Sequence, residues 1–185
     1  RLDSANPLST FYTATVTSSD SSALKADVVS GISSETTPEK TSHTFTVSQL
    51  AIAQANVGSA LDSATTSSFT AGTNTLRVTQ SGSTTDVNFT VGASDSNETV
   101  LSSLASAINN TAGLGVSASV LTDAAAGTSR LIVTSTTTGT THAFTLSNVA
   151  NTAVTNAGVT NATTAAQNAS YTQNGTALTR ETNDF

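Results

Sequence analysis

The two histidines, His43 and His142, are the side chains in this sequence best suited to bind a metal ion or to transfer a proton near neutral pH. Each has threonine as a neighbour in a strand-like stretch. Neither has a second histidine at helical spacing or an adjacent carboxylate. A zinc site needs several ligands at defined spacing. We therefore interpret both histidines as surface or strand-edge residues and predict no metal site.

The twelve acidic residues are dispersed along the chain and show no calcium-loop spacing. Asp95 and Glu98 have the spacing of a helix capping box. Asp20, Asp86 and Asp123 fall where turns are expected, and aspartate is common in turns. A carboxylate pair for glycoside hydrolysis usually comes with aromatic platforms, whereas aromatic residues make up only 4% of this chain. The acids therefore indicate local structure rather than catalysis.

Other catalytic patterns are missing from the sequence. Cysteine is absent, which excludes disulfides, thiol catalysis and cysteine-held metals. Serine is abundant, but none lies in a Gly-x-Ser-x-Gly elbow. The sequence has no phosphate-binding glycine loop and no dinucleotide-binding fingerprint. We predict that the protein is not an enzyme, that it has no catalytic residue and that it binds no cofactor; the sequence identifies no interaction residue.

The charge of the chain limits the classes of partner that it can bind. Six Lys and Arg stand against twelve acidic residues, and the net charge is −6. The basic residues are scattered, so we expect neither nucleic acid nor an anionic membrane as a partner. No apolar run reaches the roughly 20 residues of a membrane-spanning helix, and no signal peptide is visible. Because the sequence starts at Arg1 and lacks methionine, we expect a fragment of a longer protein.

The composition points to β structure. Threonine and valine favour strands. Because large apolar side chains are few, we expect a thin core of Val, Leu, Ile and Ala. Disorder is the alternative for so simple a sequence, above all in residues 151–168, which we interpret as a connecting arm. The chain is 36% hydrophobic, and its apolar residues are periodic, which argues against disorder of the whole.

A hairpin and a helix give the clearest local signals. Residues 75–79 and 87–91 alternate apolar and polar side chains on either side of Ser81-Gly82-Ser83, which predicts a hairpin. A helix over about 96–109 follows, and an apolar stripe runs along one of its faces. Three more strands are predicted after it. The segment therefore reads β-β-α-β-β-β, with the stripe made of Leu101, Leu104, Ala105 and Ile108 and the later strands at 116–120, 130–134 and 143–146.

Shorter strand patterns flank this unit, at residues 11–16 and 43–47 before it and around an Asn174-Gly175 turn after it. We predict a mainly β (α+β) fold with two small β-rich domains, one inserted in the other. Residues 11–65 plus 151–185 would form a discontinuous domain. Residues 66–150 would form the inserted domain, whose short amphipathic helix packs on its sheet.

Four segments, in order, resemble the family of the flagellar filament capping protein (hook-associated protein 2). Residues 45–54 are similar to its aromatic, Val-x-x-Leu-Ala-x-x-Gln segment. Residues 99–120 resemble the "IN" motif of flagellins and hook-associated proteins, and residues 130–139 resemble the Arg-Leu-x-Val-Thr-Ser and Thr-Gly that usually follow it. Residues 165–183 resemble the tail segment that contains Asn-Gly, with Asn168 where the family often has aspartate.

The resemblance implies a secreted, extracellular structural protein at the tip of the bacterial flagellum. There a ring-shaped homo-oligomer promotes polymerisation of its partner flagellin, and some members adhere to host surfaces. It further implies that this chain comprises the outer domains, without the coiled-coil legs or the ring-closing domain. Lacking aromatic and Arg anchors, the fragment itself is expected to be monomeric or weakly associating. The alternatives are a domain of another axial flagellar protein (flagellin or a hook-filament junction protein), or a surface adhesin or carbohydrate-binding module.

Overall fold

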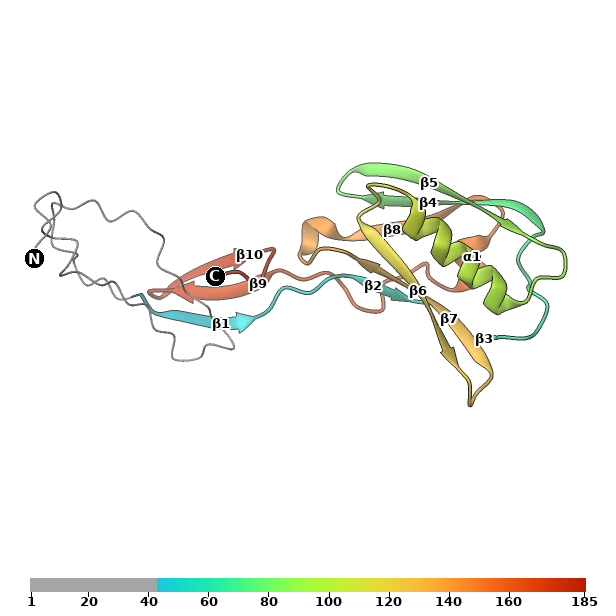
Figure 1. The fold of residues 1–185 in the computed structure, drawn as a ribbon. Coiled ribbons are helices and arrows are strands. Elements are labelled where there is room, and N and C mark those ends of the chain that lie inside the picture. The colour runs from blue at the N-terminus through green and yellow to red at the C-terminus, as the bar shows by residue number, and fades with distance from the viewer. Residues whose placement is uncertain (1–42) are drawn as a thin grey trace, which may run out of the picture.

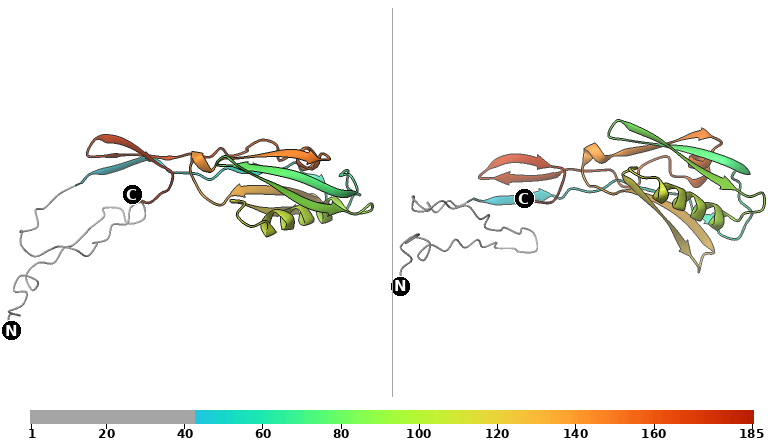
Figure 2. Two further views of the ribbon diagram at one scale, coloured as in Figure 1. Left: turned by 90° about the horizontal axis from the view of Figure 1, so that it is seen from above. Right: turned by 45° about the horizontal axis from the view of Figure 1, so that its top comes forward.

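The computed structural model describes residues 43–185, so the strand predicted at residues 11–16 lies outside the described part. A small three-stranded sheet is joined to a larger unit made of two sheets and two α-helices (Figures 1 and 2). In chain order the elements are β1 (Phe45–Gln49), β2 (Ala55–Val57), β3 (Leu61–Asp62), β4 (Gly72–Gln80), β5 (Ser83–Val91), α1 (Asn97–Asn110), β6 (Val116–Asp123), β7 (Thr128–Ser135), the 3₁₀ turn η1 (Thr140–His142), β8 (Phe144–Ala150), α2 (Ala153–Ala157), β9 (Ala169–Gln173) and β10 (Thr176–Arg180).

The small sheet, defined as β1, β9 and β10, brings together the two ends of the described chain. It has the order β1-β9-β10, and every pairing is antiparallel. The β9–β10 hairpin turns at Asn174 and Gly175, whose φ angles of 51° and 82° suit the predicted Asn-Gly turn. The Phe45 and Tyr171 rings stack with centroids 6.5 Å apart. The predicted strands around Phe45 and Tyr171 therefore pair with each other.

The large unit, defined as β2 through α2, contains both remaining sheets. One has the order β5-β4-β8. In the other, β6 pairs along the whole of β7, and the short strands β2 and β3 pair with the two ends of β7. The predicted hairpin is β4–β5, in unbroken register from Gly72↔Val91 to Gln80↔Ser83. The sheet-rich, α+β fold class is thus confirmed.

The core of the large unit consists mainly of Val, Leu, Ile and Ala, as the composition predicts, together with Phe69, Phe89 and Phe144. Helix α1 packs against β5, β6 and β7, as Figure 1 shows. Its predicted stripe is buried, with Leu101, Leu104 and Ile108 each at most 1% exposed. The stripe meets the inward residues of the two sheets, among them Leu76 and Val133. Because α1 contacts β5 of one sheet and β6 and β7 of the other, it buries apolar residues of both sheets.

The helix begins one residue later than the capping-box spacing predicted. Ser96 is the N-cap, and its hydroxyl accepts from the Thr99 N–H at 3.3 Å. The Asp95 carboxylate instead accepts the Gly92 N–H at 2.6 Å and closes the preceding turn. Glu98 does not reach back to the cap; its carboxylate accepts from the Thr122 hydroxyl. Serine takes the cap because Asp95 is already engaged one residue earlier.

Residues 153–159 are not a simple arm. Helix α2 lies within the segment that the sequence suggested was a connection, and Ala153, Val154, Ala157 and Val159 are at most 2% exposed within the core. Strands β2 and β3 likewise pair with β7. The nested two-domain division stays a prediction; these pairings favour boundaries near residues 50 and 168 rather than at 65 and 150.

Asn109 covers a strand edge that would otherwise be open. Its side-chain amide donates to the Ala118 C=O at 2.7 Å and its oxygen accepts the Ala118 N–H at 2.8 Å. Within residues 43–185, β6 pairs with no strand on that side. The two residues of the "IN" pattern therefore act together, since Ile108 fills the core while Asn109 satisfies the edge of β6.

We expect Asn109→Asp to lower the free energy of unfolding by about 1–2 kcal/mol, because the aspartate carboxylate loses the donor to the Ala118 C=O and places charge against that oxygen. Urea unfolding at neutral pH measures the change. Asn110→Asp is the matched control, since Asn110 is exposed and makes no side-chain hydrogen bond among the described residues. Equal losses in both variants would contradict the edge-covering role.

Candidate functional site

The residues singled out for chemistry do not gather into a reaction centre in the described part of the chain. His43 lies at the small sheet, with Nδ1 3.1 Å from the Asn174 side chain. His142 lies in η1, with Nδ1 3.5 Å from the Glu181 carboxylate. Among residues 43–185, no three His, Asp or Glu side chains are placed to hold a metal ion. No helix in this part has the length and hydropathy to cross a bilayer.

The acids and bases of the described chain mostly stabilise local structure. Asp86 lies in β5 rather than at the predicted turn. Arg77 on β4 donates to its two oxygens at 2.6 and 2.9 Å. This hydrogen bond lowers the pKa of Asp86 and raises that of Arg77. Backbone donors of Thr65 and Ala64 lower the pKa of Asp62. Asp123 lies at a turn, as predicted, and accepts two backbone N–H groups.

The most densely bonded polar region lies where the small sheet meets the large unit. We call it the junction, and it comprises residues 50–52, 137–142, 167–168 and 181–183. Two segments of the chain, which connect the small sheet to the large unit, run antiparallel next to each other here. Ile52 N–H donates to the Gln167 C=O at 2.8 Å, and Gln167 N–H donates back to the Ile52 C=O at 3.0 Å. The Gln167 side chain also donates to the Leu50 C=O at 3.0 Å.

A third segment joins these two segments through an asparagine. After β10, the chain returns to the junction, where the Asn183 side chain accepts the Ala51 N–H at 2.7 Å and donates to the Ala51 C=O at 3.2 Å. The amide thus substitutes for a paired strand, as Asn109 does at β6. Ala51 is itself 5% exposed. The tail residue Asn183 therefore fixes the entry of the chain into the large unit.

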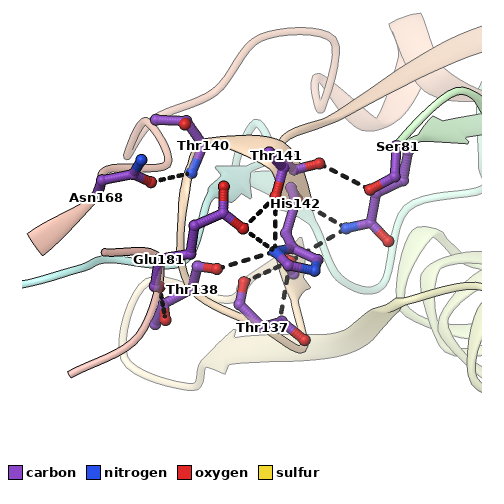
Figure 3. Close-up of polar contacts among 10 residues, drawn as sticks. Ser81, Thr137, Thr138, Thr140, Thr141, His142, Asn168 and Glu181 are labelled. Carbon is purple, nitrogen blue, oxygen red and sulfur yellow. Dashed lines mark hydrogen bonds and ion pairs between the residues drawn. The ribbon is translucent and has the colours of Figure 1, made fainter. Parts of the chain in front are cut away.

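A loop of the large unit completes the junction, as Figure 3 shows. Asn168 accepts the Thr140 N–H at 2.7 Å. The Thr138 hydroxyl donates to the Glu181 C=O at 2.6 Å, and the Thr141 hydroxyl donates to the Glu181 carboxylate. The His142 ring lies beside that carboxylate and 3.1 Å from the Thr138 C=O. Because these contacts are directional, they set the orientation of the large unit relative to the small sheet.

Sequence reasoning found some of the junction and missed the rest. The segments at 45–54 and 165–183 were singled out by their resemblance, and they supply Ala51, Gln167 and Asn183. The meeting of His142 with Glu181 had no signal, because the residues are far apart in the chain and share no motif. The family often has aspartate at the position of Asn168. The hydrogen bond from the Thr140 N–H needs only a side-chain oxygen, which asparagine and aspartate both have.

Gly139 allows the closest approach at the junction. Its φ is 95°, and an added Cβ would lie 2.5 Å from the Glu181 Cβ. We expect Gly139→Ala to accelerate hydrogen exchange at the Ala51, Ile52 and Thr140 amides. Gly127→Ala is the matched control, because Gly127 also has positive φ (66°) but open space around it. The control should lose only the backbone cost of about 1–2 kcal/mol. Unchanged exchange at the three junction amides would contradict this assignment.

Comparison with known proteins gives structural matches. No model of a known protein family matches the chain, and no curated protein matches it. It is similar to the crystal structure of the flagellar cap protein FliD D2-D3 domains from Escherichia coli, with 31% identity over 76% of this chain and 73% of that one and a TM-score of 0.60. The FliD D1-D2-D3 structure from Escherichia coli gives 31% identity, 76% and 44% coverage and a TM-score of 0.57.

The FliD D2-D3 domains from Serratia marcescens, crystallised in space group P432, give 25% identity over 80% of this chain and 82% of that one, with a TM-score of 0.55. Two of these structures consist of D2-D3 domains, of which the chain covers 73% and 82%, in agreement with the outer-domain interpretation of the sequence. With identity above 30% and most of a D2-D3 structure covered, the chain belongs to the family of the flagellar cap protein FliD.

Proposed function

We propose that this chain is the outer part of a cap at the extracellular tip of the flagellar filament, where it promotes flagellin polymerisation by presenting surface rather than by catalysis. Membership of the FliD family supports the cap role. The single observation that carries the proposal is the junction, because its network of directional bonds holds the large unit at a set angle from the small sheet. A guiding surface must keep such an angle while subunits pass.

The exposed surface suits brief contacts. Within residues 43–185, the exposed large apolar side chains do not cluster on one element. Thr, Ser and Asn dominate the remaining surface, and such polar groups bind through water-mediated hydrogen bonds. A subunit that must be folded and then released is better served by this surface than by a large apolar interface. The exposed large apolar side chains are Leu50, Ile52, Leu121, Val149 and Leu178.

The chain by itself is expected to remain monomeric or weakly associating. Arg77 is engaged with Asp86, so it is not available as an interface anchor. Sedimentation equilibrium over a wide concentration range should therefore give the mass of one chain, 18.5 kDa. A concentration-independent oligomer would overturn this expectation.

A domain exchange tests the proposed function directly. Residues 43–185 would replace the D2-D3 domains of Escherichia coli FliD, and filament length would be measured in cells that lack their own cap gene. We expect filaments to elongate when the junction is intact. A second chimera carrying Gly139→Ala should fold but give shorter filaments and more secreted flagellin monomer. A well-folded first chimera that releases flagellin without forming filaments would contradict the proposal.

A further inference from the structure

Strand β5 has an open edge. It is an outer strand of the sheet β5-β4-β8, so within residues 43–185 one of its two edges pairs with no strand. The strand is nine residues long and its pairing with β4 has no bulge. A long, regular, unpaired edge offers a row of backbone donors and acceptors to another chain.

The hairpin turn determines which backbone groups face outward. Ser81 and Gly82 have φ angles of 50° and 79°, which mark a two-residue turn of the I′ kind. The flanking pair Gln80↔Ser83 exchanges both hydrogen bonds in such a hairpin, and bonded pairs then alternate along the ladder. The N–H and C=O groups that point away from β4 are therefore those of Thr84, Asp86, Asn88 and Thr90.

An independent contact supports this assignment. Thr73 pairs with Thr90, and the Thr73 C=O accepts from the Asn151 side chain at 3.1 Å instead of from β5. Thr73 and Thr90 thus form a pair that does not exchange backbone hydrogen bonds. Among the described residues, no side chain or backbone group bonds the outward groups of Thr84, Asp86, Asn88 or Thr90. This contrasts with the β6 edge, which Asn109 covers.

A groove of about 670 Å³ lies beside the end of this edge. Phe89 and Thr90 of β5 form one wall, and α1 forms the other with Glu98 and a row of small hydroxyl side chains that includes Ser102 and Ser106. Figure 1 shows α1 running beside β5. Because these α1 side chains are small, space remains next to Thr90, the outward residue of β5 that lines the groove. Among residues 43–185, no Lys or Arg pairs with Glu98.

We propose that the β5–α1 groove binds an extended segment of another polypeptide, which adds to β5 as a further strand and places a basic side chain next to Glu98. A row of alternating outward N–H and C=O groups along several residues is matched by another extended backbone, whereas a side-chain amide satisfies only one residue. Small hydroxyls along α1 accommodate the side chains that point toward the helix. The charge of Glu98 favours lysine or arginine at that position. This inference does not depend on the role in flagellin polymerisation.

A peptide titration of the full chain tests the proposal. The probe is the capped heptapeptide Thr-Lys-Val-Ser-Val-Lys-Thr, and the comparison peptide has glutamate in place of both lysines. Amide shifts and hydrogen exchange are followed by NMR. We expect the lysine peptide to shift and protect the amides of Thr84, Asp86, Asn88 and Thr90, and the glutamate peptide to bind more weakly. No response at these amides with millimolar lysine peptide would overturn the proposal.

Two variants impair the proposed site in different ways. Asn88→Pro removes an outward N–H that β4 does not use, so the hairpin should persist while peptide affinity falls about tenfold or more. Ser102→Trp fills the groove from the helix side and should have a similar effect. Ser147→Trp, on exposed β8, is the control and should bind normally. Unchanged binding by both blocking variants would refute the site, as would concentration-dependent self-pairing of β5 in the peptide-free chain.

Discussion

Gln54→Leu should lower the free energy of unfolding of the large unit by about 3–5 kcal/mol, the largest loss we expect from a single substitution, because it leaves several buried polar groups without partners. The Gln54 side chain donates to the Phe144 C=O and to Asn56 Oδ1, both at 2.8 Å, and accepts the Phe144 N–H at 3.0 Å. Gln54 is only 5% exposed. Leucine has a similar size but satisfies none of these groups.

The effect should reach both sheets of the large unit. Gln54 precedes β2, whereas Phe144 begins β8, so one side chain links the two sheets. Asn56 continues the network, since it donates to the Val159 C=O at 2.7 Å. Urea unfolding followed by circular dichroism measures the loss. Gln49→Leu is the control, because Gln49 is exposed, and a loss no larger than in that variant would contradict the linking role.

Gly58→Ala should cost about 3 kcal/mol, because the methyl group has no space on the edge of β7. Gly58 lies between β2 and β3, and its N–H donates to the Leu131 C=O at 2.7 Å. An added Cβ would overlap the Ala157 carbonyl oxygen and lie 3.0 Å from the Leu131 carbonyl oxygen. Both neighbours are backbone atoms, so relief requires movement of α2 or β7.

Thermal unfolding of Gly58→Ala and of Gly82→Ala separates crowding from backbone strain. Gly82 has positive φ but nothing within 4 Å of an added Cβ, so its alanine variant carries only the conformational cost of about 1–2 kcal/mol. Gly58 has no such φ and carries only the contact. A Gly58→Ala protein as stable as the native chain would show that α2 can move away freely. The close packing of α2 against the β2–β3 connection would then be ruled out as a source of stability.

Regular local patterns were sufficient to predict the hairpins and α1. The β4–β5 and β9–β10 hairpins combine alternating side chains with a turn that accepts positive φ, so pattern and backbone agree. Helix α1 has 14 residues, and its buried apolar side chains recur at helical spacing from Val100 to Ile108. The cap was displaced by one residue because both Asp95 and Ser96 are good capping residues, and only tertiary contacts decide between them.

Short elements and long-range contacts were not predictable in the same way. Helix α2 has five residues, too few to show a period, and it is held by burial of Val154 rather than by helix propensity. Strands β2 and β3 are shorter still, and their ladders are formed with β7, which lies far from them in the sequence. The bond between Gln54 and Phe144 spans 90 residues, so no local pattern contains it. The junction consists mostly of such contacts between residues that are far apart in the sequence, so the sequence alone did not predict most of it.

The antiparallel backbone pairing of Ile52 with Gln167 has a consequence for the order of folding. Contacts within the small sheet join residues that are far apart in the sequence; Ser48 and Ser170, for example, are separated by 122 positions. Closing so long a loop directly carries a substantial entropic cost. Once the large unit has formed, its backbone already holds Ile52 beside Gln167, and β1 can join β9 as a short local step. The small sheet should therefore form last and open first, and its strands should exchange amide hydrogens well before β4 or β7 does.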